Sequence, residues 1–295
     1  MITLPELGAE ALGSHLAEQL NRRFSSTDAR LTKFIPHLSR LALDYIGNSD
    51  ALYHNVEHTM LVTQVGNEIM AARARLMPTS ANDYALVIAA CLFHDIGYVR
   101  GILKGDGADG YVIDSKGRKT ALARGSSDAA LMPYHVDRSK LFVKDRIAES
   151  KLLDADRISS AIECTRFPPV HGPNDNNSEG LLVRAADLIG QLGDPRYLRK
   201  ANALYHEFEE VGINRKLGYA SPADLTDQYP QFYWSSVSEH IQPAIRYLNV
   251  TSSGRRWIAS LYSNVFRAEL AAMRLASRSS RSKTARHQSQ PSGGY

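Results

Sequence analysis

The sequence predicts an all-α fold: a helical bundle with one small β-hairpin inserted into it. Apolar residues recur at helical spacing along most of the chain, as Leu12, Leu16 and Leu20 do near its start. Only the stretch 111–120 has the pattern of a short hairpin, with a Lys-Gly turn. The chain has 295 residues, which is enough for one large core.

Three parts are expected along the chain. Residues 1–50 form an N-terminal helical cap, residues 51–277 form the main domain, and residues 278–295, rich in Ser and Arg, form a disordered basic tail. The glycine-rich stretch 97–133 is an insertion in the main domain, and it carries the hairpin. Apolar periodicity places the helices at 9–24, 27–47, 54–76, 82–96, 137–152, 154–167, 178–192, 194–211, 222–226, 231–249 and 253–277.

Composition excludes several classes of protein. The formal net charge is +4, and the four basic residues from Arg278 onward account for all of it. The rest of the chain is therefore close to neutral, and its charge does not indicate a nucleic-acid-binding surface. No apolar run is long enough to span a membrane, and no basic and apolar leader opens the chain. Cys91 and Cys164 lack metal-type spacing, so we expect buried free thiols. We therefore expect a cytoplasmic protein without membrane contacts.

The most apolar stretch, 84–97, ends in His94-Asp95. A helix that is apolar on nearly all sides is normally buried. Burying an imidazole and a carboxylate costs several kcal/mol unless each group is paired or bound to a metal. These two residues are therefore the first candidates for a metal site.

Two further stretches carry polar residues into apolar surroundings. His54 and His58 are four residues apart, so on a helix they share a face, and that face continues as an apolar stripe. Asp187 lies among alanine and aliphatic residues. His58, His94, Asp95 and Asp187 together offer nitrogen and oxygen ligands without a thiolate, a set that suits Zn, Fe or Mn. The alternative is a group of hydrogen-bonded polar side chains without a metal.

The order of these motifs resembles the HD superfamily of metal-dependent phosphohydrolases, and 53–59 is most similar to class I cyclic-nucleotide phosphodiesterases. The resemblance covers residues 53 to the middle of the 240s and includes 161–167 and 186–195. It implies an HD-domain helical bundle. One departure is Tyr98, which stands where the family usually has a histidine, and another is the longer glycine-rich segment that follows.

The resemblance also implies roles. Asp95 would bridge two divalent ions, with Mg or Mn as the second, looser one, and His54 would be the general acid. Two ions so placed polarise a phosphoryl oxygen and activate a bridging water. Gln231 is the nearest match to the glutamine with which class I enzymes grip the nucleotide base. The expected substrate is a cyclic nucleotide or another small nucleotide or phosphoester.

Other candidates depend on local context. His135 begins a helix, and Arg138 and Lys140 follow it, a combination that favours a phosphate group of the substrate. His135 could instead be an extra ligand. Glu163 could orient a metal-bound water or be a plain buried acid, and His171 lies in a proline-rich loop.

Two other functions remain open at this point. A di-iron oxygenase of the same superfamily would draw further histidines from the segment before Asp187, and His135 and His171 could serve. A non-catalytic nucleotide-sensing module would keep the fold with a degenerate site. The sequence is compatible with a homodimer.

Overall fold

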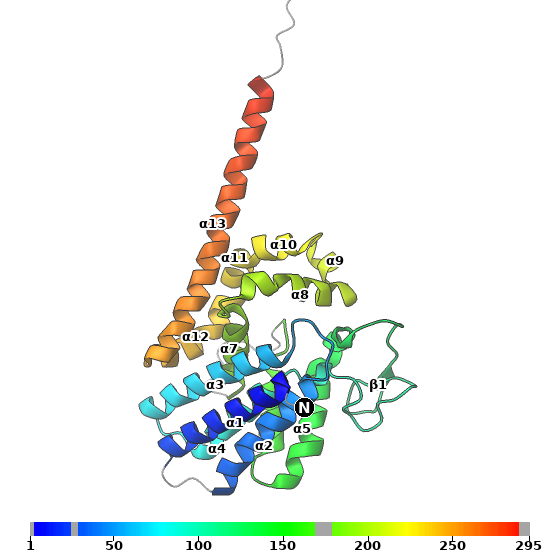
Figure 1. The fold of residues 1–295 in the computed structure, drawn as a ribbon, viewed down its shortest axis with the longest axis vertical. Coiled ribbons are helices and arrows are strands. Elements are labelled where there is room, and N and C mark those ends of the chain that lie inside the picture. The colour runs from blue at the N-terminus through cyan, green and yellow to red at the C-terminus, as the bar shows by residue number, and fades with distance from the viewer. Residues whose placement is uncertain (1–2, 25–28, 169–178, 289–295) are drawn as a thin grey trace, which may run out of the picture.

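The computed structural model describes residues 3–24, 29–168 and 179–288, and these form an all-α bundle with a single two-stranded sheet among them (Figure 1). The first part of the chain forms α1 (Leu4–Arg23), α2 (Ala29–Ile46), α3 (Val56–Leu76), α4 (Ala81–Phe93), η1 (Ile96–Tyr98), β1 (Tyr111–Val112), β2 (Lys119–Thr120), η2 (Asp128–Tyr134), α5 (His135–Ile147) and η3 (Ala148–Ser150). The second part forms α6 (Ala155–Glu163), α7 (Glu179–Leu192), α8 (Tyr197–Glu210), α9 (Ile213–Leu217), α10 (Pro222–Asp227), α11 (Tyr229–Phe232), η4 (Tyr233–Val237), α12 (Ser238–Leu248) and α13 (Ser252–Gln288).

Helix α4 is the centre of the core. Its residues from Tyr84 to Phe93 are all buried, and α2, α3, α6 and α7 pack around it. The helix begins at Ser80, whose hydroxyl accepts from the Asp83 amide in a capping box. The uniformly apolar sequence of this segment is thus explained by burial on every side, and its end carries His94 and Asp95 into the interior.

The turn after α4 is held against the start of α5. A Cβ added at Gly97 would lie 1.9 Å from the His135 carbonyl oxygen, so only glycine fits there. The Ser139 hydroxyl donates to the His94 carbonyl oxygen at 2.7 Å and accepts from the Gly97 amide at 2.9 Å. Arg138 is fully buried, and its guanidinium donates to the Gly97 and Val99 carbonyl oxygens. These contacts fix the backbone that positions the predicted ligands.

The N-terminal cap and the hairpin form where the sequence places them. Helices α1 and α2 pack on each other and on α3 and α4, and the apolar spacing of Leu12, Leu16 and Leu20 is their buried contact. In the insertion, β1 pairs antiparallel with β2, with Tyr111 opposite Thr120. Asp106 ties the insertion to the core through its ion pair with Arg138, at 2.9 Å.

The C-terminal part differs from the predicted helices in three places. The helix expected at 231–249 is divided into α11, η4 and α12. Buried residues recur every four positions from Tyr229 to Ile241, and the wider π turn of η4 keeps them on one face. Helix α9 was not predicted. Residues 278–288, expected to be disordered, continue α13 as helix, whereas 289–295 lie outside the described residues.

Among the helices that the structure describes, none is both long enough and apolar enough to span a bilayer.

We expect Gly190→Ala to lower the free energy of unfolding by about 1–3 kcal/mol, because overpacking at a rigid contact strains the backbone. The added methyl group would lie 2.8 Å from the Val62 Cα, where α7 crosses α3. Gly8→Ala is the matched control, since its methyl group would meet only the mobile end of Met60, at 3.1 Å. Urea denaturation of both variants measures the difference, and equal stabilities would contradict the close α3–α7 contact.

Candidate metal centre

Four side chains from three separate stretches meet at one point in the core. His58 comes from the first turn of α3, His94 and Asp95 follow α4, and Asp187 lies in α7. The Nε2 atoms of His58 and His94 lie 3.2 and 3.0 Å from Asp95 Oδ2. Both are also 3.5 Å from Asp187 Oδ1. The structure therefore brings the four predicted ligands together.

The atoms at this point lack ordinary hydrogen-bond partners. His58 Nε2, His94 Nε2 and Asp95 Oδ2 are buried, and none of them makes a hydrogen bond of acceptable angle. The Nδ1 atom of His94 lies 2.9 Å from the Cys91 carbonyl oxygen, so its proton is donated there and Nε2 points to the centre. A metal-ligating histidine usually has its other nitrogen held in this way. The donor set fits a divalent cation.

The electrostatics of the centre lead to the same conclusion. Burial opposes the charged imidazolium of His94, but Asp95 and Asp187 outweigh it and raise the pKa of His94 well above its ordinary value. Burial acts against the Asp187 carboxylate as well, yet the nearby imidazoles of His58 and His94 lower the pKa of Asp187 to about 2. The two carboxylates thus require positive charge beside them, which either protons on the imidazoles or a metal cation can supply.

Helix capping holds the first motif in shape. The Asn55 side chain accepts from the backbone amides of Glu57 and His58, at 3.0 and 3.3 Å, and so begins α3 one turn before the ligand. Glu57 forms ion pairs with Arg196 and Lys200 instead of facing the centre.

His54 lies beside the centre and has a carboxylate partner that the sequence analysis did not identify. Its Nδ1 is 2.5 Å from Oε2 of Glu207, and the other oxygen of Glu207 accepts from the backbone amides of Tyr53 and His54. Burial opposes protonation, but Glu207 and Asp95 prevail and raise the pKa of His54 to about 9. Glu207 is 1% exposed. The signal in the sequence was an acid on the buried face of amphipathic α8, because a buried acid needs a partner.

Tyr98 occupies the space between two histidines. Its ring stacks on His54 at 4.5 Å and on His135 at 4.6 Å, with interplanar angles of 11° and 24°. His135 Nδ1 lies 2.5 Å from the Met132 carbonyl oxygen, and its Nε2 lies 3.6 Å from Asp95 Oδ1. His135 therefore borders the centre, and the Tyr98 ring restrains both imidazoles.

Three of the predicted substrate contacts need correction. Arg138 is wholly buried, and its guanidinium is used by Asp106 and backbone carbonyl oxygens, so it has no donor left for a substrate phosphate. Lys140 pairs with Asp137 and Glu163, at 3.1 and 2.6 Å. Gln231 is exposed on α11, a helix that packs mainly on α10, η4 and α13. Sequence spacing could not reveal Asp106 or Glu163 as partners, because the hairpin insertion and α6 supply them.

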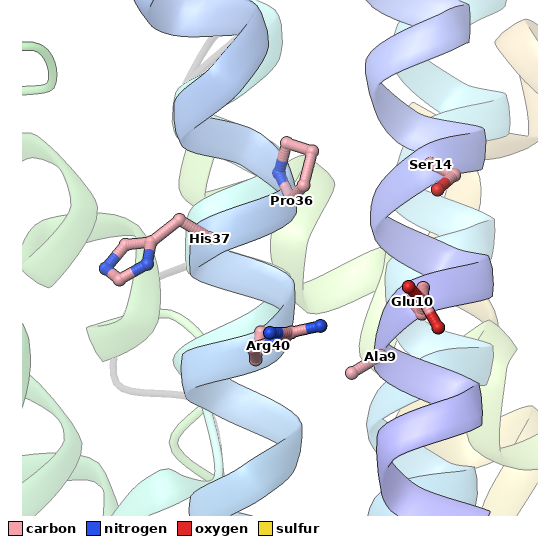
Figure 2. A pocket seen from close by; sticks show the side chains of 6 residues that line it. All are labelled: Ala9, Glu10, Ser14, Pro36, His37 and Arg40. Carbon is pink, nitrogen blue, oxygen red and sulfur yellow. The ribbon is translucent and has the colours of Figure 1, made fainter.

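The Glu163 side chain does not add to the centre. The Glu163 carboxylate binds Lys140 and Arg166, whose hydrogen bonds overcome burial and lower the pKa of Glu163 to about 2. Of the two roles that the sequence leaves open for Glu163, this pairing favours a structural acid over one that orients a metal-bound water. His171 lies outside the described residues. A separate surface pocket lies between α1 and α2 (Figure 2), and none of its lining residues belongs to the metal centre: Ala9, Glu10, Ser14, Pro36, His37 and Arg40.

Comparison with known proteins gives one family match. A family model described as Npun_R2479-like matches residues 4–271, which include every residue of the centre. No curated protein and no solved structure matches the chain.

We expect the purified protein to bind a divalent cation, and His58→Ala, His94→Ala and Asp187→Asn each to remove it, because each change deletes one of few buried ligands. Elemental analysis after dialysis against Mn²⁺ or Zn²⁺ measures the metal content. His206→Ala is the matched control, since His206 is exposed on α8 and should leave the metal content unchanged. Wild-type metal content in all three ligand variants would contradict the assignment.

We also expect metal binding to release protons and to tighten as the pH rises. The raised pKa of His94 means that, without a cation, this imidazole is protonated at neutral pH, and the proton must leave before Nε2 can bind a metal. Isothermal titration in buffers of different ionisation enthalpy counts the protons released. A metal affinity that stays constant from acid to neutral pH would be the contrary result.

Proposed function

The chain belongs to the Npun_R2479-like family, and we propose that it is a metal-dependent phosphohydrolase that cleaves a small nucleotide or another phosphoester. The observation that carries this proposal is the convergence of two imidazoles and two carboxylates with unpaired buried atoms, beside a protonated histidine. The resemblance of the motif order to HD-type phosphohydrolases supports it.

His58, His94, Asp95 and Asp187 would hold the cation. A divalent ion at such a centre supplies Lewis acidity, which polarises a phosphoryl oxygen and lowers the pKa of a coordinated water. The second carboxylate oxygen of Asp95 faces His135 Nε2, so these two atoms are the candidates for contact with a second cation. Both nitrogen and oxygen donors are present, a mixture that Zn, Fe and Mn accept.

His54 is the general acid in this proposal. Glu207 binds its Nδ1, so Nε2 is left to donate a proton, and the raised pKa keeps that proton in place at neutral pH. In hydrolysis, the water oxygen forms a new bond to phosphorus and the bond to the ester oxygen breaks. The His54 proton goes to the departing oxygen, and the attacking water loses one proton to solvent. Tyr98 limits rotation of the His54 ring during this transfer.

The proximity of His135 to Asp95 also supports a second candidate. An additional histidine beside the bridging carboxylate is the feature that a di-iron oxygenase of the same superfamily would use. Two irons in protein purified from its native expression host, without turnover of any phosphoester, would favour the oxygenase over the hydrolase.

We expect His54→Asn to lower kcat by about 10²–10⁴ on esters with a poor leaving group, because general acid catalysis contributes that much. The assay is a panel of cyclic nucleotides, dinucleotides and nucleoside monophosphates, followed by a p-nitrophenyl phosphoester. The nitrophenolate leaves without a proton, so the His54→Asn variant should lose little activity on it. Glu207→Gln should show a smaller loss with the same dependence on the leaving group.

Elemental analysis controls for the integrity of the centre, since His54→Asn should retain the metal of the wild type. Equal losses on both kinds of ester would refute the general-acid role, and absence of turnover on the whole panel with full metal content would refute the phosphohydrolase.

A further inference from the structure

The C-terminal helix α13 carries an apolar stripe on the face that points away from the body. The inner face of α13 is buried through Leu261, Val265 and Ala268. The opposite face exposes large apolar side chains at helical spacing. This outer stripe consists of Tyr262, Phe266, Leu270 and Met273, which are 38%, 59%, 37% and 65% exposed. In Figure 1, the upper half of α13 stands clear of the other elements.

Trp234 extends the outer stripe towards the body. Its ring is 55% exposed, and its indole nitrogen donates to Glu269 of α13 at 3.0 Å. Trp234 is thus a further exposed aromatic side chain, held beside α13 by its hydrogen bond to Glu269. Contiguous exposed patches of this kind mark binding sites more often than single exposed apolar residues do.

Positive charge is concentrated on the same helix. Residues 252–288 contain eight Arg and Lys residues and a single acid, Glu269. The rest of the chain contains 27 Lys and Arg against 30 Asp and Glu. Three exposed arginines follow one edge of the outer stripe at spacings of 11 and 7 residues: Arg256, Arg267 and Arg274. Over the part of α13 whose side chains the structure describes, arginines are therefore aligned with an apolar face.

We propose that α13 binds the surface of an anionic phospholipid membrane through the outer stripe. Aromatic and aliphatic side chains on one face, with arginines beside them, are the features of helices that lie in the membrane interface. Trp and Tyr favour the headgroup level, and the arginines attract anionic headgroups. The stripe lies on the convex outer surface of a single helix, which a flat bilayer accommodates without a complementary groove.

Charge decides against a second copy of this chain as the occupant of the stripe. Two α13 helices side by side would bring two strongly basic segments together, and like charges destabilise such pairs. The proposal differs from the expectation of no membrane contact, because only the folded chain reveals which apolar residues of α13 stay exposed. It is independent of the proposed phosphohydrolase.

The test uses the full chain and sedimentation with vesicles. One set contains phosphatidylcholine alone, and the other contains phosphatidylglycerol as about a third of the lipid, which gives the surface the negative potential that attracts basic segments. We expect binding at least about tenfold tighter to the anionic vesicles, falling as salt is added. In a Trp257→Phe background, the emission of Trp234 should shift to the blue on binding.

Variants separate the two components of the surface. The double change Phe266→Ser and Met273→Ser should weaken vesicle binding at least about tenfold, because two exposed apolar anchors are lost. Leu217→Ser, at a residue of α9 that is 50% exposed, is the matched control. Arg267→Gln should weaken binding to anionic vesicles, whereas Arg215→Gln on α9 should not. Circular dichroism and metal content should remain those of the wild type in all variants.

Four outcomes would overturn the proposal. Absence of binding to either kind of vesicle is the first, and equal affinity for neutral and anionic vesicles is the second. Wild-type binding by the Phe266→Ser and Met273→Ser variant is the third, since it would leave charge alone as the cause. Specific capture of an acidic protein or a nucleic acid through the same residues, with no vesicle binding, is the fourth.

Discussion

Two carboxylates that meet two buried imidazoles at one point impose the constraint on which this structure depends. Asp95 is buried and Asp187 is 19% exposed, and the buried Asp95 Oδ2 has no hydrogen bond of acceptable angle to replace its lost hydration. Without positive charge at this point, the arrangement would cost several kcal/mol. A bound cation removes that cost, so the folded core and the proposed chemistry have the same physical origin.

The surrounding elements are arranged to keep these four side chains in place. Gly97 allows the chain after α4 to pass against the His135 carbonyl oxygen, and Ser139 and Arg138 bind the backbone of that turn. Arg138 also joins the hairpin insertion to the core through Asp106. The insertion therefore contributes to the stability of the centre even though its own strands are only two residues long.

The second set of residues, His54 with Glu207 and Tyr98, turns a metal centre into a candidate active site. A cation alone can activate water, but the departing oxygen also needs a proton donor. Glu207 keeps one nitrogen of His54 occupied, and the stacked ring of Tyr98 keeps the imidazole plane fixed. Tyr98 does so by stacking on the His54 ring at 4.5 Å.

By itself, the sequence determined the helical class, the hairpin and the four side chains that meet in the core, because periodicity and the cost of burying polar groups act locally along the chain. It could not supply Glu207 as the partner of His54, the use of Arg138 by the insertion, or the π turn within 229–248. It also predicted disorder after residue 277, where the backbone of α13 continues as helix to Gln288. Only the tertiary structure decided these features, because each depends on which segments, distant in sequence, pack together and leave a polar atom or an apolar face exposed.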